Sequence, residues 1–422
     1  MEDIIKLAKL EKKSTIEYRR HLHQFPEVSK KEFKTIEFIC KKLNEFKIEY
    51  IEVPNGGIIG FIGKKGNDNK TVLLRADMDA LAVKENMYNL KQKKQCVSLI
   101  EGVSHACGHD VHVAMLLSAG KILKGIENQL NGRVILFFER AEEEGGNILY
   151  LLRYLYENNM RIDGCFGMHV KGNMESGTFS VEKGGINAGG FGFEVKIVGK
   201  GGHGSAPSQA NSPIDCFVAL YTAFTNIPVK YVPAYKACSF SLGKVQSGSK
   251  RNIIPCELDF AGSFRFLEHE VGIKVKNEFL RLLEQICKSY ECQYSIEKAI
   301  GPTLPLVNNS QCVDIAKESI TKLVGHENIV YKEQEMGSES FSAAQRLYPG
   351  VYVFLGIKND EIGAGAENHS PEFDIDEEAM PRGVALEVAY AIDFLNNEEK
   401  IEFSKYEGTP DMLYEEICYK VD

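Results

Sequence analysis

Five side chains that can bind a metal ion lie within eight positions, between His105 and His112. They comprise three histidines, one aspartate and Cys107. Thiolate and imidazole ligands together suit divalent ions such as Zn, Co or Ni, and added carboxylates extend the choice to Mn. Cys107 and His109 are two residues apart, so both can reach one ion from a loop that enters a helix. Two ligands do not make a metal site, because a loop that begins a helix can also hold a buried cysteine and hydrogen-bonded histidines.

Further acidic and histidine side chains follow apolar runs that we interpret as buried strands. They are Asp77 and Asp79 after 71–74, the acidic segment 139–144 after 133–138, His169 near the end of 163–170, and His369 after 351–355. Carboxylates that directly follow a core strand are costly unless a cation neutralises them, and open α/β sheets carry their chemistry at the carboxyl ends of their strands. A capping pair of aspartates and a solvated acidic loop are the alternatives. The convergence of these strand ends with the Cys107 loop favours a metal site.

The spacing of apolar residues predicts an α/β fold. We expect a catalytic domain, which carries the candidate metal ligands and has a mostly parallel sheet because helical stretches separate its strands, and an inserted, smaller α+β domain. From Phe191 to Ile197 every second residue is apolar, which is typical of a half-buried antiparallel strand. The expected domains are 1–185, the first part of the catalytic domain; 186–300, the inserted domain; 301–396, the second part of the catalytic domain; and 397–422, a C-terminal tail.

Composition argues against several classes of function. The 422-residue chain has a net charge of −9 and no basic stripe with interleaved aromatic residues, which argues against a nucleic-acid partner. No apolar run approaches the roughly 18 residues that a membrane-spanning helix needs. The eleven cysteines are odd in number and lack paired spacing, so we expect reduced thiols and a cytoplasmic protein.

The ordered motifs of the chain resemble those of the M20 family of metallopeptidases and amidohydrolases. The resemblance is to its N-acyl-amino-acid amidohydrolases, such as hippurate, indole-acetyl-amino-acid and N-acetyl-diaminopimelate hydrolases. The matching segments are Arg19-Arg20-His21-Leu22-His23, Leu74-Arg75-Ala76-Asp77-Met78-Asp79-Ala80-Leu81, His105-Ala106-Cys107-Gly108-His109-Asp110, Ala141-Glu142-Glu143, Met168-His169-Val170, Gly201-Gly202-His203-Gly204-Ser205-Ala206-Pro207, Asn252-Ile253-Ile254-Pro255 and His369-Ser370-Pro371. The resemblance implies hydrolysis of the linear amide bond of an N-acyl amino acid or a short peptide.

The resemblance also implies a centre of two divalent metal ions per subunit, with Zn, Mn, Co or Ni as candidates. Its implied ligands are Cys107, His109, Glu143, His169 and His369. Glu142 is implied as the general base, which takes a proton from water and later delivers it to the leaving amine. Asp77 and Asp79 are implied to orient ligands or water.

The inserted domain is implied to be a lid or dimerisation domain that supplies three residues, which hold the substrate carboxylate or the oxyanion of the tetrahedral intermediate. They are His203, which would act across a dimer interface, Asn252 and Arg265. We therefore expect a homodimer or homotetramer that takes small-molecule substrates and has no nucleic-acid or membrane partner.

The chain departs from the family's usual motifs at several places, and at two of them an acidic residue is gained or lost. Glu139-Arg140 stands where Gln-Pro commonly precedes Ala-Glu-Glu, and Ser340 stands at the place of the Asp in a Glu-Asp-Phe motif. The first departure leaves open which of Glu142 and Glu143 is the base and which is the ligand. The alternatives to N-acyl-amino-acid hydrolysis are a dipeptidase, aminopeptidase or carboxypeptidase of the same family, a catalytically silent binding protein, and a cysteine hydrolase built on the Cys-x-His pair.

Overall fold

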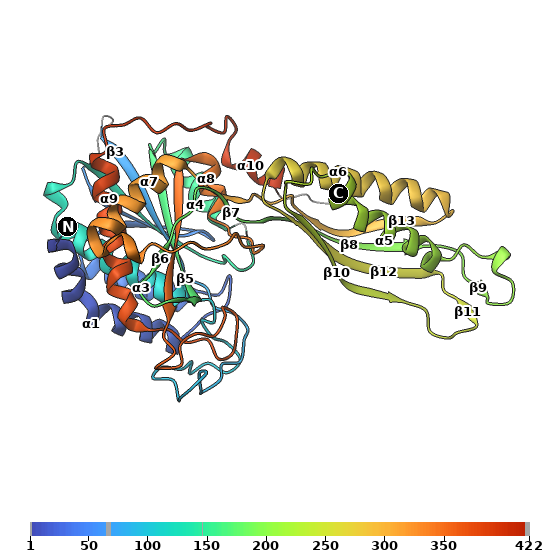
Figure 1. Cartoon of the computed structure of the whole chain (residues 1–422), viewed down its shortest axis with the longest axis horizontal. Coiled ribbons are helices and arrows are strands. Elements are labelled where there is room, and N and C mark those ends of the chain that lie inside the picture. The colour runs from blue at the N-terminus through green and yellow to red at the C-terminus, as the bar shows by residue number, and fades with distance from the viewer. Residues whose placement is uncertain (1, 65–68, 146, 418–422) are drawn as a thin grey trace. The chain divides into compact units, whose positions relative to one another are not determined.

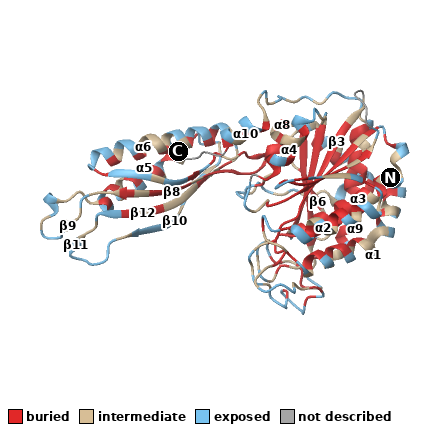
Figure 2. Ribbon diagram, turned by 180° about the vertical axis from the view of Figure 1, so that it is seen from behind, coloured by how far each residue is buried: buried red, intermediate tan, exposed pale blue. Residues whose placement is uncertain are grey.

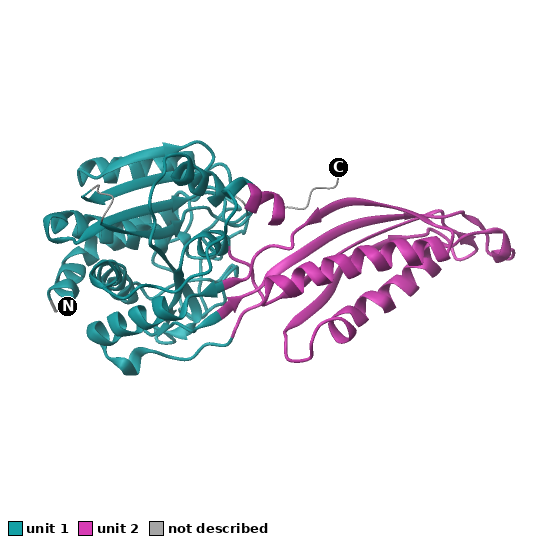
Figure 3. Cartoon of the chain, turned by 90° about the horizontal axis from the view of Figure 1, so that it is seen from above, with its two compact units in different colours: residues 1–184, 307–333, 340–411 teal, residues 185–306, 334–339, 412–422 magenta. Residues whose placement is uncertain are grey.

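The chain divides into two compact units, which Figure 3 shows in different colours. The computed structural model describes residues 2–64, 69–145 and 147–417. Unit 1 consists of residues 1–184, 307–333 and 340–411, and unit 2 of residues 185–306, 334–339 and 412–422. The chain passes between the units near strands β7 (Gly184–Asn187) and β14 (Leu306–Asn308).

The short segment 334–339 belongs to unit 2, although it lies beyond the stretch 186–300 that the change of pattern delimits. Main-chain hydrogen bonds hold it there. Glu335 N donates to Ile186 O at 2.9 Å, and Ala188 N donates to Glu335 O at 3.0 Å. Such pairing between distant segments leaves no mark in the local sequence.

Unit 1 is built on a seven-stranded sheet with the order β1-β2-β4-β3-β5-β15-β6 (Figure 1). The strands are β1 (Glu49–Val53), β2 (Gly57–Gly63), β3 (Lys70–Asp77), β4 (Gly132–Glu139), β5 (Gly164–Glu175), β6 (Phe179–Ser180) and β15 (Gly350–Lys358). The central strands β4, β3, β5 and β15 pair in parallel, and the strands at both edges pair antiparallel. The α/β fold with a large, mostly parallel sheet is therefore confirmed.

Helices bury this sheet, as parallel strands require. They are α1 (Glu2–Gln24), α2 (Phe33–Glu45), α3 (His109–Gly125), α4 (Ile148–Glu157), α7 (Ser310–Val324), α8 (Ser342–Leu347) and α9 (Met380–Asn396), with short 3-10 helices η1 (Glu127–Gln129), η3 (His326–Asn328) and η4 (Glu377–Ala379). Every residue of α3 from His109 to Gly120 is buried, because α1, α9 and the sheet pack around it (Figure 2). The helix that begins at a candidate ligand is thus held on all sides.

Unit 2 has a four-stranded antiparallel sheet with the order β10-β12-β8-β13. The strands are β8 (Gly189–Val198), β10 (Cys238–Ser247), β12 (Glu257–Phe266) and β13 (Gln293–Ile300), and the helices are α5 (Pro213–Lys230) and α6 (His269–Ser289). The alternation from Phe191 to Ile197 is confirmed, since every second side chain there is buried. Phe193 and Phe224 contact Phe279, with ring centroids 4.4 and 4.5 Å apart, so the sheet and both helices share one aromatic core.

Four smaller elements complete the described chain. They are β9 (Gly202–His203), which pairs with β11 (Ile253–Ile254), η2 (Pro207–Gln209) and α10 (Pro410–Ile417), which lies in the expected tail. Among the described residues, no helix is both long enough and apolar enough to cross a membrane.

Candidate metal centre

The loop before α3 turns sharply at Gly108. This residue has a φ of +93°, in the left-handed region, and a Cβ on it would lie 2.4 Å from Val170 Cγ2. Glycine is therefore required both by the backbone conformation and by the close packing of the loop on β5. His369 is fixed to the same loop, because its N–H donates to Ala106 O at 2.7 Å.

His169 lies within β5, not at its end as the sequence predicted, because β5 continues to Glu175. The neighbouring strand β3 pairs with β5 only as far as Arg75 and Gly167. Beyond that point Val170 of β5 packs against the Gly108 loop. His169 therefore still stands at the carboxyl edge of the sheet, where β3 stops.

Two groups of three donor atoms share Cys107. The donor atoms of Cys107, His109 and His169 all lie within 4.8 Å of one another, and so do those of Cys107, Glu143 and His369. Cys107 Sγ is 3.4 Å from His169 Nε2 and 3.3 Å from His369 Nε2. The structure therefore brings together all five predicted ligands, and the Cys107 sulfur belongs to both groups.

The environments of two of these donors, Glu143 and His169, fit a divalent metal ion. Glu143 Oε1 is buried and makes no hydrogen bond among the described residues, while His369 Nε2 lies 3.3 Å from it. Burial lowers the pKa of His169 well below its usual value, so the imidazole is neutral. Its Nδ1 lies 2.7 Å from Val170 O, which can only accept, so the lone pair is on Nε2, toward Cys107. Thiolate, imidazole and carboxylate are the ligand types expected of such a centre.

Glu142 lies beside the same donors. One of its oxygens is within 4.8 Å of donor atoms of His109 and Glu143, and its Oε1 accepts a hydrogen bond from Ser340 N at 3.1 Å. Glu144, the next acidic residue, instead pairs with a surface lysine at 2.5 Å. The acidic segment therefore divides, with Glu142 and Glu143 at the centre and Glu144 at the surface.

Asp79 supports two of the donors. Its Oδ1 is 3.1 Å from His109 Nδ1, and its Oδ2 accepts hydrogen bonds from Glu143 N at 3.1 Å and Ser29 Oγ at 2.6 Å. Because the carboxylate takes the Nδ1 side of His109, the Nε2 side faces the other donors. Second carboxylates of this kind orient metal-binding imidazoles.

Asp77 instead holds His112, to which the sequence analysis gave no role. Asp77 Oδ1 is 2.6 Å from His112 Nδ1, and His112 Nε2 accepts from Val170 N at 3.0 Å. His112 thereby ties the strand that carries His169 to the end of β3. Its position one helical turn after His109 was the signal that could have revealed this contact.

The Arg19–His23 motif packs against the residue that follows His109. Arg19 Nε and His23 Nδ1 each lie 2.8 Å from Asp110 Oδ2, and His23 Nε2 is 3.0 Å from Glu85. Burial alone would raise the pKa of Asp110, but Arg19 and His23 lower it far below the usual value. The motif therefore supports the first turn of α3.

A model of a known family covers these elements. Residues 73–393 match the family described as Peptidase family M20/M25/M40. The chain belongs to this peptidase family. It is therefore a hydrolase of amide bonds, and the resemblance seen in the motifs is confirmed.

This M20 protein is similar over most of its length to several named proteins. It is 34% identical over 387 residues to Thermostable carboxypeptidase 1 of Saccharolobus solfataricus, covering 90% of this chain and 95% of the relative. It is 31% identical over 383 residues to IAA-amino acid hydrolase ILR1-like 4 of Arabidopsis thaliana, covering 89% and 84%. A solved Bacillus subtilis structure, described as a dinuclear metal-binding peptidase from the M20 family, matches with a TM-score of 0.75 at 28% identity, covering 92% of this chain and 99% of that one.

Substitution of Asp79 by Asn in this M20 protein should weaken metal binding. The amide cannot accept from His109 and from the Glu143 N–H as a carboxylate does, so both donors lose their orientation. We expect the affinity for metal to fall by about 10–100-fold, as for other supporting partners of metal ligands. Competition with a chelating dye measures this. Ser29→Ala, which leaves both of those contacts, is the control, and equal affinity in Asp79→Asn and wild type would refute the role of Asp79.

In unit 2 of the M20 protein, His203 and Asn252 lie together. β9 pairs with β11 so that His203 is opposite Ile253, and Gly204 N donates to Asn252 O at 2.9 Å. Ser205 Oγ is 2.7 Å from His203 Nδ1. Both predicted residues are exposed, at the end of unit 2 where β12 begins.

Arg265 lies apart from this pair within the same unit. It is near the other end of β12, about 27 Å from Glu257 at the usual rise of about 3.4 Å per residue. Its Nη1 donates to Ser338 Oγ at 2.5 Å. The structure thus separates one of the three predicted substrate-binding residues from the other two.

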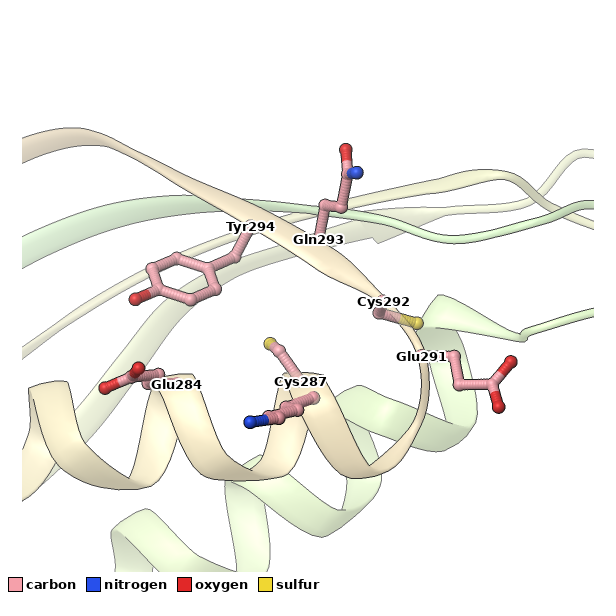
Figure 4. A pocket seen from close by; sticks show the side chains of 7 residues that line it. Glu284, Cys287, Glu291, Cys292, Gln293 and Tyr294 are labelled. Carbon is pink, nitrogen blue, oxygen red and sulfur yellow. The ribbon is translucent and has the colours of Figure 1, made fainter.

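Figure 4 shows a pocket within unit 2 of the M20 protein, where α6 ends and β13 begins. Its volume is about 560 Å³, and it is lined by Glu284, Cys287, Lys288, Glu291, Cys292, Gln293 and Tyr294. None of the predicted site residues lines it. We therefore give it no part in the chemistry of the metal centre.

Proposed function

We propose that this M20 protein hydrolyses the amide bond of N-acyl amino acids with a centre of two divalent metal ions. The observation that carries the proposal is the pair of donor groups that share Cys107, with a Glu142 oxygen beside them. The proposed ligands are Cys107, His109, Glu143, His169 and His369. Zn, Mn, Co and Ni all suit this set of donors.

Glu142 is the residue that moves protons in the proposed reaction. Divalent ions, when bound, acidify water and polarise the scissile carbonyl. Glu142 takes a proton from the attacking water and gives it to the amine nitrogen as the amide C–N bond breaks. The buried Oε1 of Glu143, near His369, supports the ligand role for Glu143 and leaves the base role to Glu142.

The substrate class is supported by Arg265 and by one relative. The amino-acid part of the substrate carries a carboxylate, for which the planar fork of an arginine is suited. Arg265 Nη1 contacts the neutral hydroxyl of Ser338, which does not cancel the charge of the guanidinium. The Arabidopsis relative is named as an IAA-amino acid hydrolase, and such a substrate is an N-acyl amino acid.

A carboxypeptidase is the second candidate. The Saccharolobus relative, 34% identical, bears that name. Arg265 would then hold the C-terminal carboxylate of a peptide, and Glu142 would act as before. The two candidates differ in the group on the acyl side of the scissile bond, which is an acyl group in one case and an aminoacyl group in the other.

We also propose that the protein is a homodimer or a larger homo-oligomer. Helix α5 has an exposed apolar face made of Ile214, Val218, Tyr221 and Val229. No charged residue lies between Asp215 and Lys230. A face of this kind is typical of an interface between proteins. A partner subunit would also account for the distance between His203 and Arg265, because each copy could supply one of them to a site. Sedimentation equilibrium distinguishes the 47.2 kDa chain from its multiples.

The cysteines support a reducing compartment. All ten that the structure describes are free, including the proposed ligand Cys107. Because disulfides are rare where thiols are kept reduced, we propose that the protein works in a cytoplasm.

Hydrolysis of a substrate panel tests the proposed function. Protein stripped by a chelator is given Zn, Mn, Co or Ni singly, then acetyl-, benzoyl- and indole-acetyl-amino acids and peptides with free or blocked termini. Metal-restored release of amino acids from the N-acyl compounds would support the proposal. Cleavage of peptides alone would favour the carboxypeptidase, and metal binding without any turnover would favour the silent binding protein.

A further inference from the structure

Two positions at which the chain departs from the family's usual motifs contact each other. Ser340 Oγ donates a hydrogen bond to Glu139 Oε1 at 2.6 Å, although the residues are 201 positions apart. Glu139 is the last residue of β4 and is fully buried. The two side chains are therefore parts of one buried, hydrogen-bonded contact.

Arg75 joins these two residues to Asp77. Its guanidinium donates through Nε to Glu139 Oε2 at 2.7 Å, through Nη1 to Asp77 Oδ2 at 2.8 Å, and through Nη2 to Ser340 Oγ at 2.9 Å. The side chains of Arg75, Asp77 and Glu139 are at most 1% exposed. A buried cluster of this kind is stable only when its charges are paired and its hydrogen bonds are made. The number of carboxylates around Arg75 therefore matters.

The cluster ends at Glu142. Ser340 N donates to Glu142 Oε1 at 3.1 Å, while the hydroxyl of the same residue donates to Glu139 and accepts from Arg75. The Ser340 hydroxyl therefore donates its single proton to Glu139, and one of its lone pairs accepts the hydrogen bond from Arg75. Any shift of Glu139 or Arg75 moves residue 340, and with it the N–H that orients Glu142.

We propose that Glu139 and Ser340 form one positioning unit for Glu142, in which a single buried carboxylate can stand at either position. The proposal rests on the proposed function, in which Glu142 is the general base. In this chain Glu139 supplies the carboxylate, and a hydroxyl at 340 completes the hydrogen bonds without adding charge. A glutamine at 139 with an aspartate at 340 would present the same charge to Arg75.

The two single substitutions disturb the unit in opposite directions. Glu139→Gln removes a negative charge from the buried guanidinium of Arg75. Ser340→Asp adds a third carboxylate to those of Glu139 and Asp77 around the same guanidinium. Both change the net charge that the wild-type cluster holds buried and leave its hydrogen bonds mismatched, which is costly. The double variant restores the charge, so it should recover what each single variant loses.

The test measures kcat, KM, bound metal and melting temperature for both single variants and the double variant, on the substrate that the wild type cleaves best. We expect each single variant to lose about 10–100-fold in kcat and the double variant to return to within about 5-fold of wild type, a coupling of the size seen for residues in one network. KM and the content of two metal ions should stay unchanged. Loss of kcat alone is the result expected of a group that orients a base.

A matched control exists away from the centre. Ser319 Oγ donates to Asp393 Oδ2 at 2.7 Å, between α7 and α9, which is the same pairing of hydroxyl and carboxylate. Asp393→Asn should lower the melting temperature and leave kcat unchanged.

Several outcomes would overturn the proposal. One is a double variant whose loss in kcat equals the product of the single losses. Should the charge variants fail to fold, Ser340→Thr, which keeps the hydroxyl, and Ser340→Ala, which lacks it, test the same contact. A lower kcat in the alanine variant alone supports the unit, and equal values overturn it.

Failure of the proposed function gives a different pattern. If the wild type cleaves only peptides, the substrate assignment is wrong. The kcat of the single and double variants is then measured on a peptide. If it cleaves neither N-acyl amino acids nor peptides, the proposed function is wrong. The melting temperatures of the single and double variants then test the positioning unit. Recovery in the double variant then supports the shared carboxylate, and additive loss overturns it.

Discussion

Substitution of Glu142 by Gln should lower kcat by about 10²–10⁴-fold, the usual contribution of a general acid–base residue, while the protein keeps two metal ions. Glutamine has nearly the same shape, and its carbonyl oxygen can still accept the hydrogen bond from Ser340 N. It cannot take a proton from water, so only the chemical step should suffer. Steady-state kinetics and elemental analysis of the metal content, made on the same preparation, measure the two effects.

Glu144→Gln is the matched control for this experiment. It removes one carboxylate two residues away, but Glu144 pairs with a surface lysine and is not near the donor groups. Its kcat should equal that of wild type. Normal hydrolysis by the Glu142 variant would show that the base is another group. Loss of metal from that variant would make Glu142 a ligand instead, and Glu143 would become the candidate base.

Substitution of Cys107 by Ser should empty both halves of the centre. Cys107 belongs to both groups of donors, whereas His169 and His369 belong to one each. Thiolate is the form of cysteine that binds metal, and a serine hydroxyl does not ionise in this way. We expect the affinity to fall by more than the roughly 10–100-fold that loss of a supporting partner costs, with bound metal near zero. His169→Ala and His369→Ala should each retain about one ion.

Cys312→Ser is the control for the cysteine variant, because Cys312 is a fully buried free thiol in α7. It should keep two ions and normal kcat. If Cys107→Ser binds two ions but is inactive, and a chelator does not inhibit the wild type, the protein is a cysteine hydrolase. That outcome would refute the shared-ligand arrangement.

The donor set could be predicted because its signals are local. Asp77 ends β3 and Glu139 ends β4, and parallel strands bring such ends to one edge of a sheet. Cys107 and His109 are recognisable from their spacing in a loop before a helix. The five proposed ligands follow from the resemblance of these short, ordered segments to the motifs of the family, and the structure brings their donor atoms together.

The supporting contacts could not be predicted in the same way. In the sequence, Arg75 shows no sign of a special role at the end of a strand. Only the register of β3 against β4 and the path of residues 339–341 bring its side chain to Glu139 and Ser340. Local sequence carries no information about a contact between β4 and a segment 201 positions away. For this reason, the two departures appear as separate changes in the sequence.

The position of Arg265 shows a similar limit. Arg265 lies on the face of β12 opposite the buried phenylalanines. No local pattern indicated that the position of Arg265 along the strand is far from the β9–β11 pair, which carries His203 and Asn252. Distance along a strand becomes meaningful only when the pairing of its neighbours is known.

The way the chain divides between the units has a consequence for its synthesis. All the buried residues of the unit 2 core lie between Phe191 and Ala299, in one continuous stretch. The unit 1 sheet, in contrast, needs β15 to pair with β5 across that whole stretch, and α9 to cover it. Unit 2 can therefore fold on the ribosome before β15 and α9 have been synthesised. Until then the apolar faces of β3, β4 and β5 are exposed. We expect this nascent intermediate to be the state most prone to aggregate and the one that chaperones bind.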